Sequence, residues 1–311
     1  MMRSMCDMDT VQIEILNACN HSCSNCTRFC QLVQKPYFMP LDEVKRAIDS
    51  MVGYPKMVGI MGGEPLLHPD FEAICKYAGS KINANQLGLW TTLPKGFEKH
   101  AQVICDTFYH IFVNDHSRPD IFHQPPLVGI QEIQSDKNMM WQMIDHCWAQ
   151  HSWSASVNPR GAWFCEIAAA MSMLFEEGEG WPVEPGWWWR TPKDFKEQME
   201  RFCPRCGFAA PTALRASVEE VDDISPLNYE ALKDKVRHPE RFKIHPLTCT
   251  NERPAMAAYK EFNYRNRIAK RYGMFLTINE MGFWTPYMDD GNAMTIPSKS
   301  IFETYQERFG A

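Results

Sequence analysis

CNHSCSNC, at residues 19–26, places three cysteines in one short segment with the spacing C-x3-C-x2-C. The segment directly follows VQIEIL at residues 11–16, an apolar run with the composition of a β-strand. Iron in proteins favours soft thiolate ligands, and a cubane iron–sulfur cluster normally takes four of them. Three cysteines in one loop, with no fourth at a matching interval, therefore predict a cluster in which one iron keeps an open coordination position.

A second motif, GGEP at residues 62–65, ends another apolar run that begins at residue 57. Paired glycines allow the backbone to approach a ligand closely, and the Glu64 carboxylate can accept a charge-assisted hydrogen bond from an ammonium group. Together the two motifs, one strand–helix unit apart, resemble the signature of the radical S-adenosylmethionine (SAM) enzymes. Three cysteines alone also fit a zinc knuckle or a buried cysteine cluster, and the second motif disfavours both.

The resemblance implies a cofactor set. In radical SAM enzymes the open iron binds the amino and carboxylate groups of SAM, and one-electron reduction cleaves SAM to a 5′-deoxyadenosyl radical. The cluster ligands implied for this chain are Cys19, Cys23 and Cys26. The residues implied in binding SAM are Gly62, Gly63, Glu64 and Pro65. The implied cofactors are a SAM-binding [4Fe–4S] cluster and SAM.

The apolar periodicity after the cysteine motif predicts alternating helices and strands. We expect helices at residues 41–52, 71–78 and 97–108, and strands at residues 57–60, 86–92 and 109–114. This alternation requires parallel strands joined by right-handed crossovers, so the predicted fold class is α/β with a partial (β/α) barrel. Residues 125–130 are a candidate fifth strand. Cys75 and Cys105 lie on apolar helix faces, and we expect both in the core.

Chemistry in such barrels gathers at the carboxyl ends of the strands. Both motifs follow predicted strands, as do residues 91–92 and 114–116, so we expect all of them at one pocket. Further candidates for SAM binding are Thr91, Thr92 and Asn114. If the enzyme oxidises an alcohol, it also needs a polar residue that takes up the hydroxyl proton. The candidates for this catalytic role are Arg118, Asp115, His116 and Glu166.

A second set of cysteines lies at positions 147, 165, 203 and 206 and ends in C-x2-C. Residues 153–164 between the first two read as a hairpin with its turn at 158–161. The arrangement resembles the twitch module, the shorter relative of the SPASM domain, and most of all that of the cyclitol (2-deoxy-scyllo-inosamine) dehydrogenases of butirosin biosynthesis. The resemblance implies a second, auxiliary [4Fe–4S] cluster with the ligands Cys147, Cys165, Cys203 and Cys206.

Two alternatives remain open for this second set. Four cysteines that end in C-x2-C also suit a structural zinc site, although the upstream radical SAM motifs favour iron and sulfide. If one of the four is not a ligand, Cys249 or Cys30 is the expected replacement. The insertion WWWR at residues 187–190 has no counterpart in the modules that this set resembles, and it leaves the substrate open.

Composition limits the remaining functions. The chain has 311 residues, a net charge of −6 and 12 cysteines, with no acidic or basic block that would suit nucleic acid. The apolar run at residues 168–175 is too short to span a bilayer, and no signal peptide is visible, so we expect a cytoplasmic protein without a membrane partner. We expect the barrel at residues 1–140, a small α+β auxiliary-cluster module at 141–210, and a mainly helical C-terminal extension at 211–311.

Within the C-terminal extension, residues 229–242 and 256–272 read as amphipathic helices, and residues 283–287 as an aromatic loop. Solvated helices packed on the barrel are the simplest interpretation of this region. An active-site cover supplied by the aromatic loop is the alternative.

Three hypotheses of function follow. The first is oxidation of a sugar or cyclitol alcohol to a ketone, with the auxiliary cluster as electron acceptor. The second is modification of a ribosomally made peptide by crosslinking or epimerisation, for which no leader-binding domain is visible. The third is a non-enzymatic electron-transfer protein, which GGEP disfavours because a ferredoxin needs no SAM pocket. Both enzyme hypotheses imply a reductant of the flavodoxin or ferredoxin type.

Overall fold

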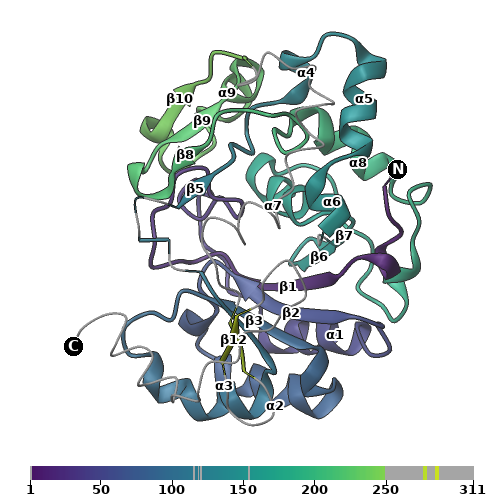
Figure 1. The fold of residues 1–311 in the computed structure, drawn as a ribbon, viewed down its shortest axis with the longest axis vertical. Helices are drawn as coiled ribbons and strands as arrows, with labels where there is room; N and C mark the ends of the chain where they lie inside the picture. The colour runs from purple at the N-terminus through teal and green to yellow at the C-terminus, as the bar shows by residue number, and fades with distance from the viewer. Residues whose placement is uncertain are drawn as a thin grey trace.

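The computed structural model describes residues 2–114, 116, 117, 119, 121–152, 155–248, 276–278 and 284–286. Within these residues the centre is a sheet with the strand order β12-β11-β4-β3-β2-β1-β6-β7 (Figure 1). The strands at the start of the chain are β1 (Thr10–Leu16), β2 (Met57–Gly62), β3 (Leu87–Thr91) and β4 (His110–Val113). They pair in chain order and all run parallel, as the α/β prediction requires.

Three helices connect these strands and pack together below the sheet in Figure 1. They are α1 (Leu41–Ser50), α2 (Phe71–Lys81) and α3 (Ala101–Thr107), the last preceded by the 3-10 turn η4 (Phe97–His100). The apolar residues at helical spacing, such as Val44, Ile48 and Ile74, are fully buried, whereas the intervening charged residues face solvent. Cys75 lies in the core as predicted. The prediction for Cys105 is wrong, because its side chain is exposed on α3.

The predicted hairpin at residues 153–164 extends the sheet on the far side of β1. It consists of β6 (Ala155–Asn158) and β7 (Gly161–Trp163), and β6 runs parallel to β1. Asn158 fixes the turn, because its side-chain oxygen accepts from the Arg160 amide at 2.9 Å and from the Trp163 indole at 2.9 Å. Gly161 has a φ of 117°, which side chains rarely tolerate. The turn therefore starts β7 and directs the chain towards residue 165.

A buried helix, α7 (Glu166–Phe175), follows the hairpin and packs against β6 and α8 (Lys196–Phe202). The triple-tryptophan insertion forms the turn η5 (Trp187–Trp189), which docks on the end of α1. The Trp187 indole donates to the Ser50 hydroxyl at 3.2 Å, and the Trp188 indole donates to the Ser50 carbonyl at 3.1 Å. The insertion therefore holds the second half of the chain against the first crossover helix.

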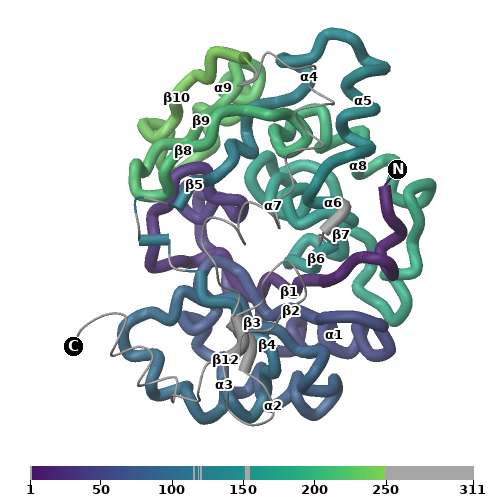
Figure 2. The backbone as a smooth tube through the Cα atoms, viewed as in Figure 1, coloured from purple at the N-terminus to yellow at the C-terminus, as the bar shows by residue number. Residues whose placement is uncertain are grey.

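The remaining described elements are short. They are η1 (Met5–Asp7), η2 (Pro65–Leu67), η3 (Ala84–Gln86), β5 (Phe122–His123), α4 (Ile130–Ile133), α5 (Lys137–Asp145), α6 (Trp148–Ser152), η6 (Cys203–Arg205), β8 (Arg215–Ala216), η7 (Ser217–Glu219), β9 (Asp222–Ile224), α9 (Pro226–Leu232), η8 (Pro239–Arg241), β10 (Phe242–Ile244), β11 (Leu276–Ile278) and β12 (Trp284–Pro286). β5 pairs with β8, and β9 with β10. Figure 2 shows the loop after β1 beside β5 and β8, far from it in sequence.

Several predicted elements differ from the structure. The fifth strand predicted at 125–130 is wrong: only Leu127 makes an isolated bridge, to Ile224, because the two prolines at 125 and 126 have no N–H for a ladder. The helix predicted at 229–242 is wrong in its bounds, since α9 ends at Leu232 and η8 begins at Pro239. Part of the predicted aromatic loop forms β12, paired with β11. The helix predicted at 256–272 lies outside the described residues.

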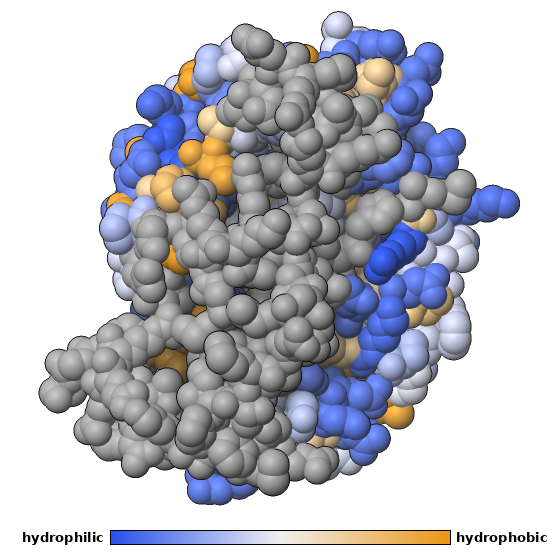
Figure 3. All heavy atoms as spheres, viewed as in Figure 1, coloured by the Kyte–Doolittle hydropathy of each residue, from blue (hydrophilic) through white to orange (hydrophobic). Residues whose placement is uncertain are grey.

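The surface agrees with the polar composition. The described residues visible in Figure 3 are mostly hydrophilic, with a smaller group of hydrophobic ones at the upper left. Among the described residues, no helix has the length and apolar content that crossing a membrane requires.

Candidate active site and cysteine clusters

The ends of the four parallel strands meet beside the first cysteine motif. The Gly63 amide donates to the Leu16 carbonyl at 3.0 Å, and the Glu64 amide to the Ala18 carbonyl at 2.8 Å. At the next strand end, the Asn114 amide donates to the Thr91 carbonyl at 2.8 Å. These backbone contacts join β2 to the loop after β1, and the end of β4 to the end of β3.

The two glycines of GGEP are required by contact with the chain itself. A Cβ at Gly62 would lie 2.1 Å from the Leu16 carbonyl oxygen, and one at Gly63 would lie 2.2 Å from the Ala18 carbonyl oxygen. Both distances are too short for any side chain. The glycines therefore allow β2 to pack against the backbone that leads into the cysteine loop, a role that the sequence argument assigned to close approach of a ligand.

The Glu64 carboxylate is fully buried and already has protein partners. One oxygen accepts from the Leu66 amide at 3.0 Å and the Thr91 hydroxyl at 2.7 Å. The other accepts from the Thr92 amide at 2.6 Å and the Thr92 hydroxyl at 2.8 Å. A carboxylate has about four acceptor positions, so these contacts use them and fix the end of β3. Direct binding of SAM by this side chain, by Pro65 or by the two threonines stays a prediction.

The first three cysteines lie together in a loop of partial burial. Burial raises the pKa of the Cys23 thiol far above its usual range, and the neighbouring Cys26 and Cys19 thiolates raise it further. The His21 amide points at the Cys19 sulfur at 3.4 Å. Three thiols on one loop fit the donor set of a cluster that leaves one iron free for another ligand.

A fourth thiol, Cys30, belongs to this region and was misjudged from the sequence. The Cys30 side chain is buried beside the thiols of Cys19 and Cys26, and its hydrogen-bonding interaction lowers the pKa of Cys26 to about 6. The sequence shows no fourth cysteine at a matching interval, but the structure places Cys30 beside the first set. The suggestion that Cys30 replaces an auxiliary ligand is wrong, because its sulfur contacts the first set. The other suggested replacement, Cys249, lies outside the described residues.

A buried ion cluster lies beneath the loop. The Arg28 guanidinium donates to the Glu166 carboxylate at 2.7 Å, and its Nε lies 3.7 Å from the Glu14 carboxylate. Burial opposes the charge on Arg28, yet Glu14 and Glu166 together raise the pKa of Arg28 above its usual value. Burial raises the pKa of Glu14. Of the candidate proton acceptors, Glu166 is thus already held by an arginine.

Two histidines form a relay that ends on the cysteine loop. His123 Nδ1 lies 2.6 Å from the Ser24 carbonyl oxygen, which can only accept, so His123 donates there. In a neutral His123 the Nε2 atom then accepts, and its 2.8 Å contact with His116 makes His116 Nδ1 the donor. Burial lowers the pKa of both imidazoles, most strongly that of His116. His116 therefore carries its lone pair on Nε2.

The other two candidate proton acceptors, Asp115 and Arg118, lie outside the described residues. Of the two candidates that the structure describes, Glu166 is paired with Arg28, whereas His116 has a nitrogen lone pair that can accept a proton. Nothing in the local sequence predicted His123 as its partner, because two histidines seven positions apart have no characteristic spacing. The contact depends on the path of the chain between β4 and β5.

The structure brings the second set of cysteines to one cavity. Cys147, Cys165, Cys203 and Cys206 line it together with apolar side chains, among them Phe164 and Phe208. Burial first, and the neighbouring Cys165 second, raise the pKa of Cys147 to about 12. Burial also raises the pKa values of Cys203 and Cys206. The four thiols therefore share one largely apolar space.

Each wall of this cavity comes from a different element. Cys147 precedes α6, Cys165 is the residue before α7, and Cys203 begins η6 after α8, with Cys206 directly after η6. Backbone amides point at the sulfurs: those of Ala149 and Gln150 at Cys147, and that of Phe208 at Cys206 at 3.4 Å. Among the described residues, no group of three or more His, Cys, Asp and Glu side chains has the arrangement of a site for a single metal ion.

Comparisons with known proteins agree with the first motif. Residues 13–109 match the family model described as "Radical SAM superfamily". This match confirms the predicted resemblance, and the superfamily implies an enzyme that uses a [4Fe–4S] cluster and SAM. No curated protein matches the chain.

Two solved structures are similar in fold. One is "Crystal structure of BtrN in complex with AdoMet and 2-DOIA", with 14% identity, a TM-score of 0.44 and coverage of 64% of this chain and 88% of that chain. The other is "Crystal structure of SeMet BtrN in an OPEN conformation", with 12% identity, a TM-score of 0.44 and coverage of 68% and 96% respectively.

Proposed function

We propose that this protein is a radical SAM enzyme that oxidises an alcohol of a sugar or cyclitol to a ketone. The observation that carries the proposal is that the four cysteines of the second set line one apolar cavity, separate from the loop that holds the first set. A cluster bound by four thiolates has no open iron, so its chemical use is to accept or pass an electron. Removal of an electron turns a carbon radical that bears a hydroxyl group into a carbonyl.

The cysteines of the two sets fit the two iron–sulfur clusters that the proposal requires. Cys19, Cys23 and Cys26 would hold the first cluster and leave one iron for SAM, and the second cysteine set would hold the other cluster. When bound, these groups supply an oxidant that removes a hydrogen atom from the carbinol carbon and an acceptor that takes up one electron. The protein then has to bind the alcohol near the strand ends, exclude water and accept the hydroxyl proton.

His116 is the proposed proton acceptor. Its Nδ1 hydrogen is directed to His123, so its Nε2 lone pair is available for the hydroxyl group of a substrate. The relay continues to the Ser24 carbonyl in the cysteine loop, which holds both rings beside that loop. A neutral imidazole is the form that acts as a general base, and burial favours it here. The proton moves from the substrate oxygen to Nε2.

The electron donor is proposed to be a protein of the flavodoxin or ferredoxin type. The substrate is proposed to be a small molecule, because the second cysteine set resembles that of cyclitol dehydrogenases. Peptide modification is the competing outcome of the test below.

The test uses anaerobically reconstituted full-length protein with SAM and dithionite, and a panel of cyclitols, aminocyclitols and sugar alcohols. We expect at least one compound to raise 5′-deoxyadenosine formation and to give a ketone in a one-to-one ratio with it. The matched control is Cys105→Ser, which changes an exposed cysteine on α3 and should behave like the wild type. Stimulation by peptides alone, with a crosslinked or epimerised product, would contradict the proposal.

A further inference from the structure

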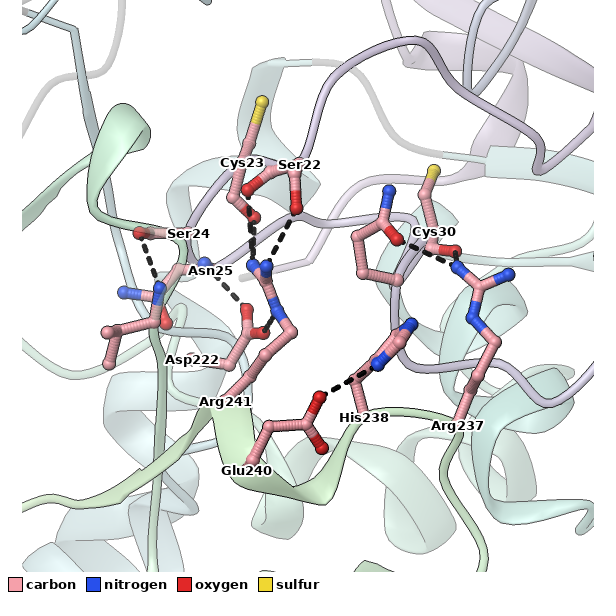
Figure 4. Close-up of polar contacts among 12 residues, drawn as sticks. Ser22, Cys23, Ser24, Asn25, Cys30, Asp222, Arg237, His238, Glu240 and Arg241 are labelled. Atoms are coloured by element: carbon pink, nitrogen blue, oxygen red, sulfur yellow. Dashed lines mark hydrogen bonds and ion pairs between the residues drawn. The ribbon is translucent and has the colours of Figure 1, made fainter.

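The segment at residues 215–241, here called the clamp segment, lies along the first cysteine loop (Figure 4). The Ser24 amide donates to the Ser217 carbonyl at 2.8 Å, and the Val221 amide donates to the Ser24 hydroxyl at 3.0 Å. Further along, Arg237 donates to the Cys30 carbonyl at 3.2 Å. The loop that carries the cluster ligands is therefore held by a part of the chain about two hundred positions away in sequence.

Arg241 makes the most extensive of these contacts. Its guanidinium donates to the Ser22 hydroxyl at 2.8 Å, to the Ser22 carbonyl at 3.2 Å and to the Cys23 carbonyl at 3.0 Å. Figure 4 shows the side chain directed between these groups and Asp222. Arg241 is 9% exposed, so its charge acts on the loop with little screening by water.

Asp222 completes the contact from the other side. One oxygen accepts from Arg241 Nε at 2.7 Å, and the other accepts from the Asn25 amide at 2.8 Å. Asp222 is 3% exposed, so the two residues form a buried ion pair. Arg241 therefore holds the residue Cys23, whereas Asp222 holds the residue just before Cys26.

The conformation of Asn25 explains why this hold is needed. Asn25 has a φ of 51°, in the left-handed region that non-glycine residues seldom adopt. Its side chain exchanges two hydrogen bonds with Asp223, at 3.0 Å to the carboxylate and 2.8 Å from the amide. Left-handed backbone at this position turns the chain between Cys23 and Cys26, and the clamp segment stabilises it.

We infer that Arg241 and Asp222 position the cysteine loop and, through their opposite charges, set the reduction potential of the cluster bound there. The inference rests on the proposed function only in that the first cluster must form. Net charge and hydrogen bonds around a cluster are among the factors that fix its potential. A positive charge beside Cys23 favours the reduced cluster, which carries one more electron, and a negative charge beside Cys26 disfavours it.

The test is a redox titration of anaerobically reconstituted full-length protein, monitored by electron paramagnetic resonance (EPR) without added SAM. The signal followed is the one that changes when SAM is added to a separate sample. The variants are Arg241→Gln, Asp222→Asn and the double variant. We expect Arg241→Gln to lower the equilibrium constant for reduction about tenfold, which is about 59 mV for one electron. Asp222→Asn should raise this constant, and the double variant should lie within about threefold of the wild type.

Shifts of the reduction potential in opposite directions in the two single variants would show an effect of charge, which a purely structural role of the two residues would not produce. The matched control is Arg237→Gln, which removes the same charge and the loop hydrogen bonds at Cys30 and Gln31, whereas the described hydrogen bonds to Ser22 and Cys23 come from Arg241. Its expected shift is below threefold. If Arg241→Gln loses its cluster, Asp222→Asn, which keeps Arg241, still decides the question. Shifts in the same direction, unchanged potentials, or loss of the cluster in all three variants would overturn the inference.

If the proposed function is wrong, the redox titration gives a different result from the one expected if only this inference is wrong. A wild-type protein with no SAM-responsive cluster would refute the radical SAM assignment itself. A SAM-responsive cluster with the same potential in every variant would refute only the role of Arg241 and Asp222.

Discussion

The two cysteine regions use the same ligand chemistry in opposite surroundings. The first loop is polar: its carbonyls accept from arginines of the clamp segment, and Arg28 lies beneath it. The second set lines a cavity whose other walls are largely apolar, with backbone amides as the nearest donors. Thiolate number alone does not separate the two, because Cys30 brings a fourth sulfur to the first region as well.

This difference indicates that access to the site and the charged groups around it decide which chemistry a cysteine cluster can support. A site that binds a charged cofactor needs polar groups, and the first loop has them around it. A site that only stores an electron works best when buried and closed. The predictions below test this contrast, beginning with the largest expected effect.

Cys23→Ala should reduce 5′-deoxyadenosine formation to the background level, because Cys19 and Cys26 alone cannot hold the SAM-binding cluster and Cys30 is expected only to donate a hydrogen bond. The second cluster should remain, since none of its ligands lies in this loop. The measurement is 5′-deoxyadenosine by liquid chromatography, together with iron content. SAM cleavage above the level measured for protein without iron would contradict the assignment of the SAM-binding cluster to the first cysteine loop.

Replacement of both Cys203 and Cys206 by Ala should halve the iron content and leave SAM cleavage within a few-fold of the wild type. The reason is that none of the residues that line the second cavity belongs to the first cysteine loop. Circular dichroism must accompany the assay, because a metal centre that joins distant segments also stabilises the fold. A folded double variant with wild-type iron content would show that these cysteines bind no cluster.

Gly63→Ala should destabilise the fold by about 1–3 kcal/mol, because its methyl group would overlap the Ala18 carbonyl oxygen. Thermal unfolding monitored by circular dichroism measures this. The matched control is Gly79→Ala in α2, where the nearest atom would lie at 3.8 Å. This control should stabilise the protein by roughly 0.5–1 kcal/mol, since alanine favours helix. Equal effects at the two sites would argue against the close packing of β2 on the cysteine loop.

Cys30→Ser should have the smallest effect. If Cys30 only donates a hydrogen bond to the cluster ligands, its variant should keep the full iron content and SAM cleavage within about threefold of the wild type. Loss of SAM cleavage comparable to that of Cys23→Ala would instead make Cys30 a ligand or an essential donor. That result would add a fourth thiolate to the first site, and the two cysteine regions would then differ only in their surroundings.

The sequence predicted what depends on local pattern. The parallel strands β1 to β4, their helices and the hairpin at 155–163 follow from apolar periodicity and turn residues, and the glycine pair was visible as a motif. The contacts of Arg241 and Asp222 with the loop were invisible, because a contact across 219 positions leaves no local pattern. Cys105 was misjudged because α3 begins after a 3-10 turn, which rotates the residues that follow relative to a continuous helix.

The central claim is that the chain holds two clusters of different kinds, and metal analysis with EPR tests it most directly. Anaerobically reconstituted protein should contain about eight irons and eight sulfides per chain. In the reduced protein, one of two EPR signals should change on addition of SAM, and the other should stay the same. About four irons, with zinc bound at the second site, would contradict the account, as would two signals that both respond to SAM.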